Sequence, residues 1–316
     1  MKLPQSHDVH GRTTDNFLPW LVTQQCRGLF ILQAARTHYV LNPSTGRMAA
    51  LPESGAKGDQ SVTHLGLGYD THTRTHKVVC ICCLPESVRY KVYEINSVPA
   101  IWRPAKGCAP EKPPLDWVNN HHDMSVFAQG HVYWLDRRKL TASQSEEMFV
   151  FSFNLDDEVF GTVSLPQQIV MERMFQDQYN LTELGGRLCI FHTEMVCHAT
   201  TGRYNVWLLR DHDTSVWDLH CRINRYTLPA KVANLMRPRY WFSLLTIIDI
   251  GRRTVIRPSS YTYDPSFRMC AYIPVIDATG NLLDGSNGLV SDNSMTLHYA
   301  ALYDESIASP GDILAS

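Results

Sequence analysis

The stretch Met148–Pro166, which reads MFVFSFNLDDEVFGTVSLP, decides the fold class. Apolar side chains recur at every second position from Phe149 to Leu155, which is the two-residue period of a β-strand. The acidic residues Asp156–Glu158 then supply a polar turn, and Phe160–Leu165 returns as a second apolar run. Pattern and turn chemistry together predict a β-hairpin here.

The same hairpin recurs along the chain. Its turn residues follow one another at spacings of 54, 60, 55 and 53 residues, at Asn42, Asn96, Asp156, Asp211 and Asp264. A glycine opens an apolar strand shortly before three of these hairpins, at Gly28, Gly130 and Gly186. A period of roughly 50 residues with four strands per unit is typical of a propeller blade. We therefore predict an all-β, β-propeller-like ring of about five to six four-stranded blades.

The repeats predict how the chain is organised. Five blades are countable, over residues 26–54, 64–109, 123–167, 179–225 and 238–278. We expect an N-terminal extension over residues 1–25, one propeller-like domain over 26–303 and a flexible C-terminal tail over 304–316. A blade cannot bury both of its faces alone, so blades pack side by side. The aromatic residues expected to pack between blades are Tyr133, Trp134, Phe151, Phe153, Trp207 and Trp217.

Composition narrows the class of partner. The 316 residues include 29 Lys+Arg and 31 Asp+Glu, and this near-neutral balance argues against a nucleic-acid partner bound through a basic surface. The longest apolar stretch, Tyr240–Ile248, is too short to span a bilayer, so no membrane partner is expected. Nine cysteines without framework spacing, and no apolar leader at the start, predict a cytoplasmic or nuclear protein.

Five short motifs occur in a fixed order. They are CRGLFIL at Cys26–Leu32, YVLNPSTG at Tyr39–Gly46 closing in Leu51-Pro52, GLGYD at Gly66–Asp70 with KVV at Lys77–Val79, GHVYWL at Gly130–Leu135, and SFNLDDEVF at Ser152–Phe160 closing in Leu165-Pro166. In this order and spacing, over about residues 26–275, the motifs resemble those of the F-box-associated domain of plant F-box proteins. The chain departs from the family pattern at Asn154, where Asp is usual.

The resemblance implies a protein–protein interaction module. In the family, an N-terminal F-box binds the Skp1 adaptor of an SCF ubiquitin ligase, and the propeller-like part captures a target protein. The 25 residues before Cys26 contain no F-box-like helical run, because Leu18–Leu21 is far too short. We therefore expect the chain as written not to bind Skp1, which becomes a partner only if an F-box is missing from this sequence. A lost F-box, an incomplete sequence and a stand-alone binding domain remain open, and the target protein is not named by the sequence.

Metal-ligand residues gather at three places without forming a site. Adjacent histidines in His121-His122-Asp123 point to opposite sides of an extended chain, so we interpret them as solvated. Cys80, Cys82 and Cys83 lack a second ligand pair and are interpreted as core residues of a strand. Cys189, Cys197 and His198 are interpreted in the same way. The sequence predicts no metal and no cofactor.

Catalytic patterns are also missing from the sequence. Gly66 and Gly68 lack the third glycine and the following helix of a dinucleotide loop. A propeller glycosidase needs two carboxylates across a cleft, and nothing in the sequence pairs the acidic candidates Asp123, Asp136, Glu183 and Glu194. We therefore predict no catalytic residues and a chain that is not an enzyme. A propeller-fold hydrolase and a degenerate paralogue without activity are the alternatives.

Connecting loops at one end of the ring are the expected binding surface, since rigid elements position loops for recognition. Aromatic and arginine side chains are favoured anchors in such interfaces. Candidates for protein binding near exposed connectors are Trp117, His121, His122, Arg137 and Arg138. Trp117 is equally well interpreted as a buried plug between blades.

Overall fold

A computed structural model describes residues 20–34, 37–54, 62–84, 87–107, 124–136, 149–171, 178–196, 199–227, 244–250, 253–259 and 275–276. In these residues the chain is all-β, and its helices are the short α1 (Gln167–Met171) and the single 3-10 turn η2 (Arg225–Thr227). Contacts divide the chain into two compact units. The first comprises Met1–Ser145, Phe151–Gly161 and Ala301–Ser316, and the second comprises Glu146–Val150 and Thr162–Ala300.

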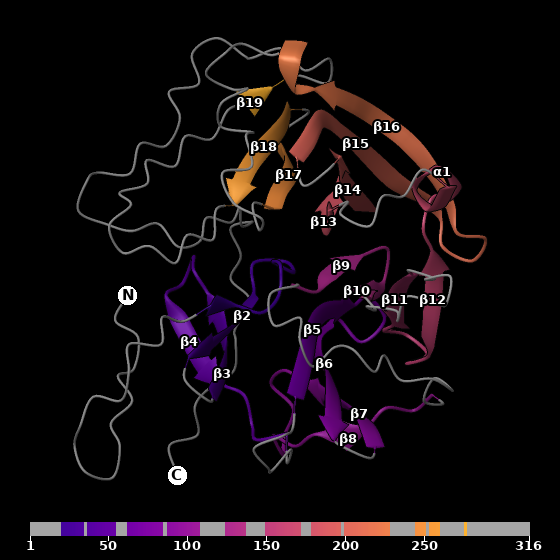
Figure 1. The fold of residues 1–316 in the computed structure, drawn as a ribbon. Coiled ribbons are helices and arrows are strands. Elements are labelled where there is room, and N and C mark those ends of the chain that lie inside the picture. Colours follow the sequence, from indigo (N-terminus) through magenta and orange to yellow (C-terminus); the bar gives the residue numbers. More distant parts are fainter. Residues whose placement is uncertain are drawn as a thin grey trace. The chain divides into compact units, whose positions relative to one another are not determined.

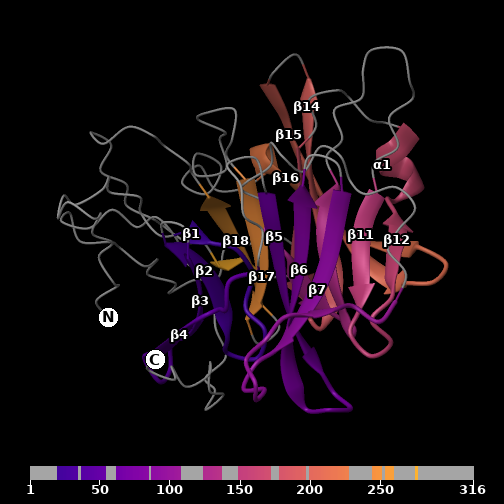
Figure 2. The same ribbon diagram turned by 90° about the horizontal axis from the view of Figure 1, so that it is seen from below.

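The strands of each sheet follow one another in the sequence, so every sheet is a meander (Figure 1). The first sheet has the order β1-β2-β3-β4, with β1 (Trp20–Leu21), β2 (Phe30–Ala34), β3 (Thr37–Asn42) and β4 (Arg47–Ala50). The second has the order β5-β6-β7-β8, with β5 (Val62–Asp70), β6 (Thr75–Leu84), β7 (Ser87–Glu94) and β8 (Arg103–Pro104). Figure 2 shows the long strands β5, β6 and β7 side by side.

The described residues form three further sheets. The third has the order β12-β11-β10-β9, with β9 (Val126–Ala128), β10 (His131–Asp136), β11 (Phe149–Asn154) and β12 (Phe160–Ser164). The fourth has the order β13-β14-β15-β16, with β13 (Gln178–Leu184), β14 (Arg187–Val196), β15 (Ala199–Asp211) and β16 (Val216–Asn224). The fifth has three described strands, β17 (Leu244–Ile250), β18 (Arg253–Ser259) and β19 (Val275–Ile276).

The repeat seen in the sequence is confirmed by these sheets. Asn42, Asn96, Asp156 and Asp211 lie at or within the connections between the third and fourth strands of successive sheets, while Asp264 lies outside the described residues. Gly28, Gly130 and Gly186 each lie just before a second strand. The fold is therefore the expected β-propeller-like repeat of small antiparallel sheets.

Two-residue turns with both φ angles positive join the first and second strands in three sheets. The pairs are Arg27 (φ 46) with Gly28 (φ 83), Gln129 (φ 50) with Gly130 (φ 78), and Gly185 (φ 59) with Gly186 (φ 80). A type I′ turn needs this conformation at both central residues, and its twist matches that of the flanking strands. Glycine stands at the second position because it adopts positive φ without steric cost.

Side-chain oxygens stabilise the connections between third and fourth strands. The Asn42 side chain accepts hydrogen bonds from the backbone amides of Ser44 and Thr45, at 2.9 and 3.4 Å. Asp211 does the same for Asp213 and Thr214. In the third sheet the acceptor is Asn154, which binds the amide of Asp156 at 2.8 Å. Asp156 itself lies within the turn, as predicted, and the side-chain acceptor stands two residues earlier, at the end of β11.

In the first unit the core lies between neighbouring sheets, and β6 shows why. Val78, Cys80 and Cys82 pack with residues of the first sheet, whereas Val79, Ile81 and Cys83 pack with residues of the third. A strand covered on both faces is apolar at every position instead of at alternate ones. The predicted packing of Trp134, Phe151 and Phe153 between sheets is confirmed, since all three belong to the core between the second and third sheets.

The remaining aromatic predictions are partly met. Tyr133 and Trp207 are buried, with 0% and 5% of their surface exposed. Trp217 is only half-buried, and its indole N–H donates to the Ser164 carbonyl at 2.7 Å. The expectation of one apolar face for β11 was too narrow, because Val150 and Ser152 are buried together with Phe151 and Phe153.

Candidate functional site

The five predicted binding residues, Trp117, His121, His122, Arg137 and Arg138, all lie outside the described residues, and so does Asp123. Their role therefore stays a prediction. Sequence positions place them in connections that follow β8 and β10. In the part of the chain that the structure describes, no group of three or more His, Cys, Asp or Glu side chains is arranged to hold a metal ion. No helix among those residues is long and apolar enough to cross a membrane.

The cysteine interpretation is confirmed where the structure tests it. Cys80, Cys82 and Cys83 lie on β6 and are buried, and Cys189 is buried on β14. Cys197 and His198 are outside the described residues. Among the acidic candidates, Glu183 accepts a hydrogen bond from the Gly186 amide, and Glu194 accepts one from the Asn205 amide group at 2.9 Å. Both therefore have local partners.

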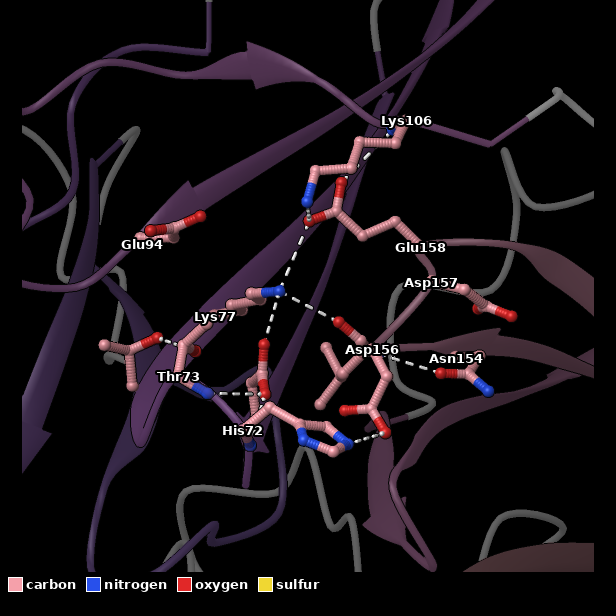
Figure 3. A network of polar contacts seen from close by, with 12 residues as sticks. His72, Thr73, Lys77, Glu94, Lys106, Asn154, Asp156, Asp157 and Glu158 are labelled. Carbon is pink, nitrogen blue, oxygen red and sulfur yellow. Dashed lines mark hydrogen bonds and ion pairs between the residues drawn. The ribbon is translucent and has the colours of Figure 1, made fainter.

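The main polar cluster of the described residues surrounds Lys77. Strand register puts Lys77 opposite Gly68, close to the end of the β5–β6 hairpin, with only 2% of its surface exposed. Its ammonium lies 2.7 Å from Asp70 Oδ2, 3.3 Å from Glu158 Oε1 and 2.9 Å from the Leu155 carbonyl oxygen (Figure 3). An ammonium has three N–H donors, so these partners use all of them.

Glu158 is the second centre of the cluster and is fully buried. Both of its oxygens accept hydrogen bonds from the Arg103 guanidinium, at 2.7 and 2.5 Å, and Oε2 also accepts one from the Lys106 amide at 3.1 Å. Arg103 binds Glu94 at 2.7 Å as well. The bidentate geometry is that of the strongest ion pairs in proteins. The turn between β11 and β12 is thereby tied directly to β6 and β8, and through Arg103 to Glu94 on β7.

Backbone geometry places Glu158 in this position. Its φ is +61°, which residues other than glycine rarely adopt. The amide of Gly107 donates to the Glu158 carbonyl at 3.2 Å, and a Cβ on Gly107 would collide with that carbonyl. The unusual conformation is therefore held by the segment that follows β8.

The charges set the protonation of both carboxyl groups. Burial by itself favours the neutral acid, but hydrogen bonds from Arg103 and the Lys106 amide outweigh it and lower the pKa of Glu158 to about 2. Burial also opposes ionisation of Asp70, and there hydrogen bonds from Lys77, Thr73 and His72 hold the pKa well below its ordinary value. Both groups are ionised at neutral pH, and neither is poised to exchange a proton near pH 7.

The glycines of the GLGYD motif contribute to the same interface by being small. A Cβ on Gly66 would overlap Trp134 and Val132, and one on Gly68 would overlap Leu155. The third sheet therefore packs directly against the backbone of β5. Gly66 and Gly68 lie within a strand and not in a phosphate-binding loop, as the sequence interpretation expected.

Three of the five sequence motifs thus meet in one place. GLGYD supplies the two small positions and Asp70, KVV supplies Lys77, GHVYWL supplies Trp134, and SFNLDDEVF supplies Leu155 and Glu158. The sequence analysis missed this cluster because it interpreted acidic residues only as turn formers. A usable signal was present, because Lys77 opens the apolar run of β6 and a cation buried there requires an anion.

Polar contacts also join the first sheet to the second. The His76 ring nitrogen Nε2 donates to the Cys26 carbonyl at 3.2 Å, and the Arg27 guanidinium lies 3.9 Å from the centre of the Tyr69 ring. The Trp102 indole N–H donates to the Pro52 carbonyl at 2.8 Å. Charged and aromatic groups in this unit thus serve to fasten neighbouring sheets, and the described cluster has the character of a structural centre.

Comparison with known proteins agrees with this reading of the motifs. The sequence model of a family described as "F-box associated beta propeller domain" matches residues 2–265. A curated relative from Arabidopsis thaliana, named "Putative F-box protein", is 25% identical over 201 residues. The match takes in 63% of this chain, which spans 45% of that relative's length.

Two solved structures are distantly similar to this chain. A chain from a study of two prolyl endopeptidases has a TM-score of 0.40 at 9% identity, over 87% of this chain and 35% of that one. The Malassezia sympodialis allergen Mala s 1 has a TM-score of 0.33 at 10% identity, over 76% of this chain and 86% of that one. Neither likeness carries an argument about function. The family match covers most of the sequence, so this chain belongs to the F-box associated beta propeller domain family.

Proposed function

We propose that this chain is a protein-interaction module that captures a target protein for ubiquitin ligation. Membership of the F-box associated beta propeller domain family is the observation that carries the proposal. The curated relative is named an F-box protein, and this chain corresponds to less than half of its length. We assign target capture to these 316 residues and leave adaptor binding to an F-box elsewhere in a longer protein of this kind.

The division of labour between core and loops supports a binding role. The charged side chains of the described cluster bind one another, which leaves recognition to residues at the ends of the sheets. Rigid sheets hold such connecting segments in place and reduce the entropy lost on binding. Trp117, His121, His122, Arg137 and Arg138 are our candidates for the contacts, because aromatic and arginine side chains dominate binding energy in interfaces.

Affinity capture from plant extract tests the proposal. The purified chain is immobilised, bound proteins are identified by mass spectrometry, and each candidate is purified and measured for direct binding. We expect a reproducible target whose affinity falls about 10-fold or more when Arg137 and Arg138 are both replaced by alanine. The matched control replaces the exposed strand residues Arg47 and Arg89, and should leave the affinity within about 2-fold.

Two outcomes would contradict the proposal. Turnover of glycosides or esters by the purified chain would show a propeller hydrolase, because a pure binding module has no such activity. Capture of Skp1 by direct binding to this chain would show that adaptor binding resides here, against the division of roles proposed above. If the Arg137/Arg138 and the Arg47/Arg89 double variants lost target affinity equally, the assignment of Arg137 and Arg138 to the interface would be wrong. The proposed binding function would still stand.

A further inference from the structure

The side chains of Cys80 and Cys82 lie against each other on one face of β6. Their sulfur atoms are 3.2 Å apart, which is hydrogen-bond distance for a thiol and closer than ordinary packing of two sulfurs. Both residues are buried, at 0% and 2% exposure, in the core between the first and second sheets. Cys83 points to the opposite face, into the core shared with the third sheet. Neither the family motifs nor the charge cluster makes use of this thiol pair.

The surroundings of the pair favour a thiolate on Cys82. Register places Lys91 of β7 opposite Cys80, and the Lys91 ammonium binds the Ser54 carbonyl at 2.5 Å. The two thiols share a hydrogen bond, and with Cys80 as its donor this bond, the Ser54 hydroxyl and the positive charges of Lys91 and Arg89 hold the pKa of Cys82 below that of an ordinary thiol despite burial. The pKa of Cys80 is raised in turn, so Cys80 keeps its proton.

We propose that Cys80 and Cys82 form a reversible disulfide when the protein meets a peroxide. The Cys82 thiolate attacks one oxygen of hydrogen peroxide, which breaks the O–O bond, releases hydroxide and leaves a sulfenic acid on Cys82. The Cys80 sulfur then attacks the Cys82 sulfur, and the S–O bond breaks. The Cys80 proton and the departing hydroxyl leave as water. The cysteines lose two electrons in total, and the peroxide is reduced to water.

Access to the pair requires little movement. Ser54 and Lys91 are both half-buried, and the Ser54 hydroxyl and the Lys91 charge both act on Cys82, so part of each residue near the pair reaches solvent. Cys82 stands two residues before the end of β6 at Leu84. A molecule as small as hydrogen peroxide therefore needs only a local opening of the strand end.

Strand geometry determines the character of the disulfide. Two residues apart on an extended strand, the Cα atoms are about 6.6 Å apart, close to the upper limit of about 6.8 Å for disulfides. Closing the bond must shorten β6 locally and disturb its pairing with β5 and β7. Strain of this kind makes a disulfide easy to reduce, so the bond is suited to reversal by cellular thiols.

Peptide mapping of the purified full chain tests the proposal. The reduced protein is treated with hydrogen peroxide, the peroxide is removed with catalase, and free thiols are alkylated before digestion. We expect the peptide that contains Cys80, Cys82 and Cys83 to lose two hydrogen atoms and to retain one alkylated cysteine, at position 83. Dithiothreitol should restore three alkylation sites. Fragmentation of the peptide locates the bond in the wild-type chain without any variant.

Variants separate the pair from its neighbour. Cys83→Ser should leave disulfide formation intact, whereas Cys82→Ser should abolish it. A bond between Cys82 and Cys83, a disulfide between two chains, or oxidation that stops at sulfinic acid would each overturn the proposal, and so would an unchanged peptide. None of these readouts depends on target binding, so the outcome is independent of the proposed function.

Discussion

Single residues decide whether neighbouring sheets of the first unit hold together. Glu158 accepts four hydrogen bonds from three residues, Lys77, Arg103 and Lys106, while being fully buried itself. A buried charge of this kind is tolerable only when its partners are all present. The cluster therefore contributes more through the cost of breaking it than through the attraction of any one pair.

Replacing Glu158 by glutamine should lower the free energy of unfolding by about 3 kcal/mol, because the buried Lys77 loses one of its two anionic partners and the half-buried Arg103 loses its bidentate partner. Urea denaturation followed by tryptophan fluorescence measures the change. The control is Asp157→Asn on the neighbouring exposed residue, which keeps its side-chain acceptor and should change stability by less than about 0.5 kcal/mol. Equal effects in the two variants would show that the network contributes little.

The prediction for Gly66 concerns the size of its side chain and not its charge. Gly66→Ala should destabilise the protein by about 1–3 kcal/mol, because the added methyl group overlaps Trp134 and Val132 in a packed core. The matched control is Gly161→Ala, where the nearest atom is the Ser152 hydroxyl at 3.1 Å. Combining Gly66→Ala with Trp134→Leu tests the contact itself. The cost of the alanine should shrink in that background, and additive effects would contradict the contact.

At the scale of elements, turn geometry explains why the sheets repeat. Three hairpins between first and second strands use the same pair of positive φ angles. Strand β6 then shows how burial on two faces removes the alternation that marks a half-exposed strand. Local turn chemistry and two-sided packing together produce the unit that the chain repeats.

The turn at Gln129-Gly130 gives a prediction at this scale. Gln129 has a φ of 50°, and asparagine tolerates that region better than glutamine does. Gln129→Asn should therefore raise the free energy of unfolding by about 0.5 kcal/mol, measured as the urea midpoint. Gln129→Val should lower it, since a β-branched side chain is strained at positive φ. Identical midpoints in the two variants would refute the turn assignment.

At the scale of the whole molecule, buried ionisable groups couple stability to acid. Burial lowers the pKa of both His38 and His76 to about 4, so the folded protein keeps these rings neutral at pH 5. The unfolded chain binds protons at the same sites with ordinary pKa values near 6.5. Stability therefore falls as the pH drops from about 6.5 towards 4.

Denaturation midpoints measured between pH 7.5 and 4 should decrease steadily. His76→Gln should flatten this decrease, because the buried titrating ring is gone while a side-chain donor for the Cys26 carbonyl remains. Below about pH 4.5 a second loss begins, since the unfolded chain protonates carboxyl groups that Glu158 and Asp70 keep ionised in the folded state. Stability that is constant from pH 7.5 to 4 would contradict the burial of both histidines.

Patterns that act over a few residues were readable without coordinates. Alternation around Phe151, the turn residues Asn42 and Asp211, and the glycine before each second strand predicted the repeat, because strand period and turn conformation are local properties. The family motifs were readable for the same reason. The contacts that each motif makes in the folded protein could not be predicted from the sequence, as the missed role of Lys77 shows.

The amino-acid sequence by itself determined that this protein is a repeat of small antiparallel sheets from the F-box associated family, since periodicity, turn chemistry and motif order are all written along the chain. Only the tertiary structure decided that Lys77 binds Glu158 81 positions away, and that residues of the first sheet cover the face of β6 that carries Cys80 and Cys82. Those contacts depend on which sheet packs against which and on how each side chain turns. The free energy that selects them comes from burial and charge pairing between distant segments, which no local pattern records.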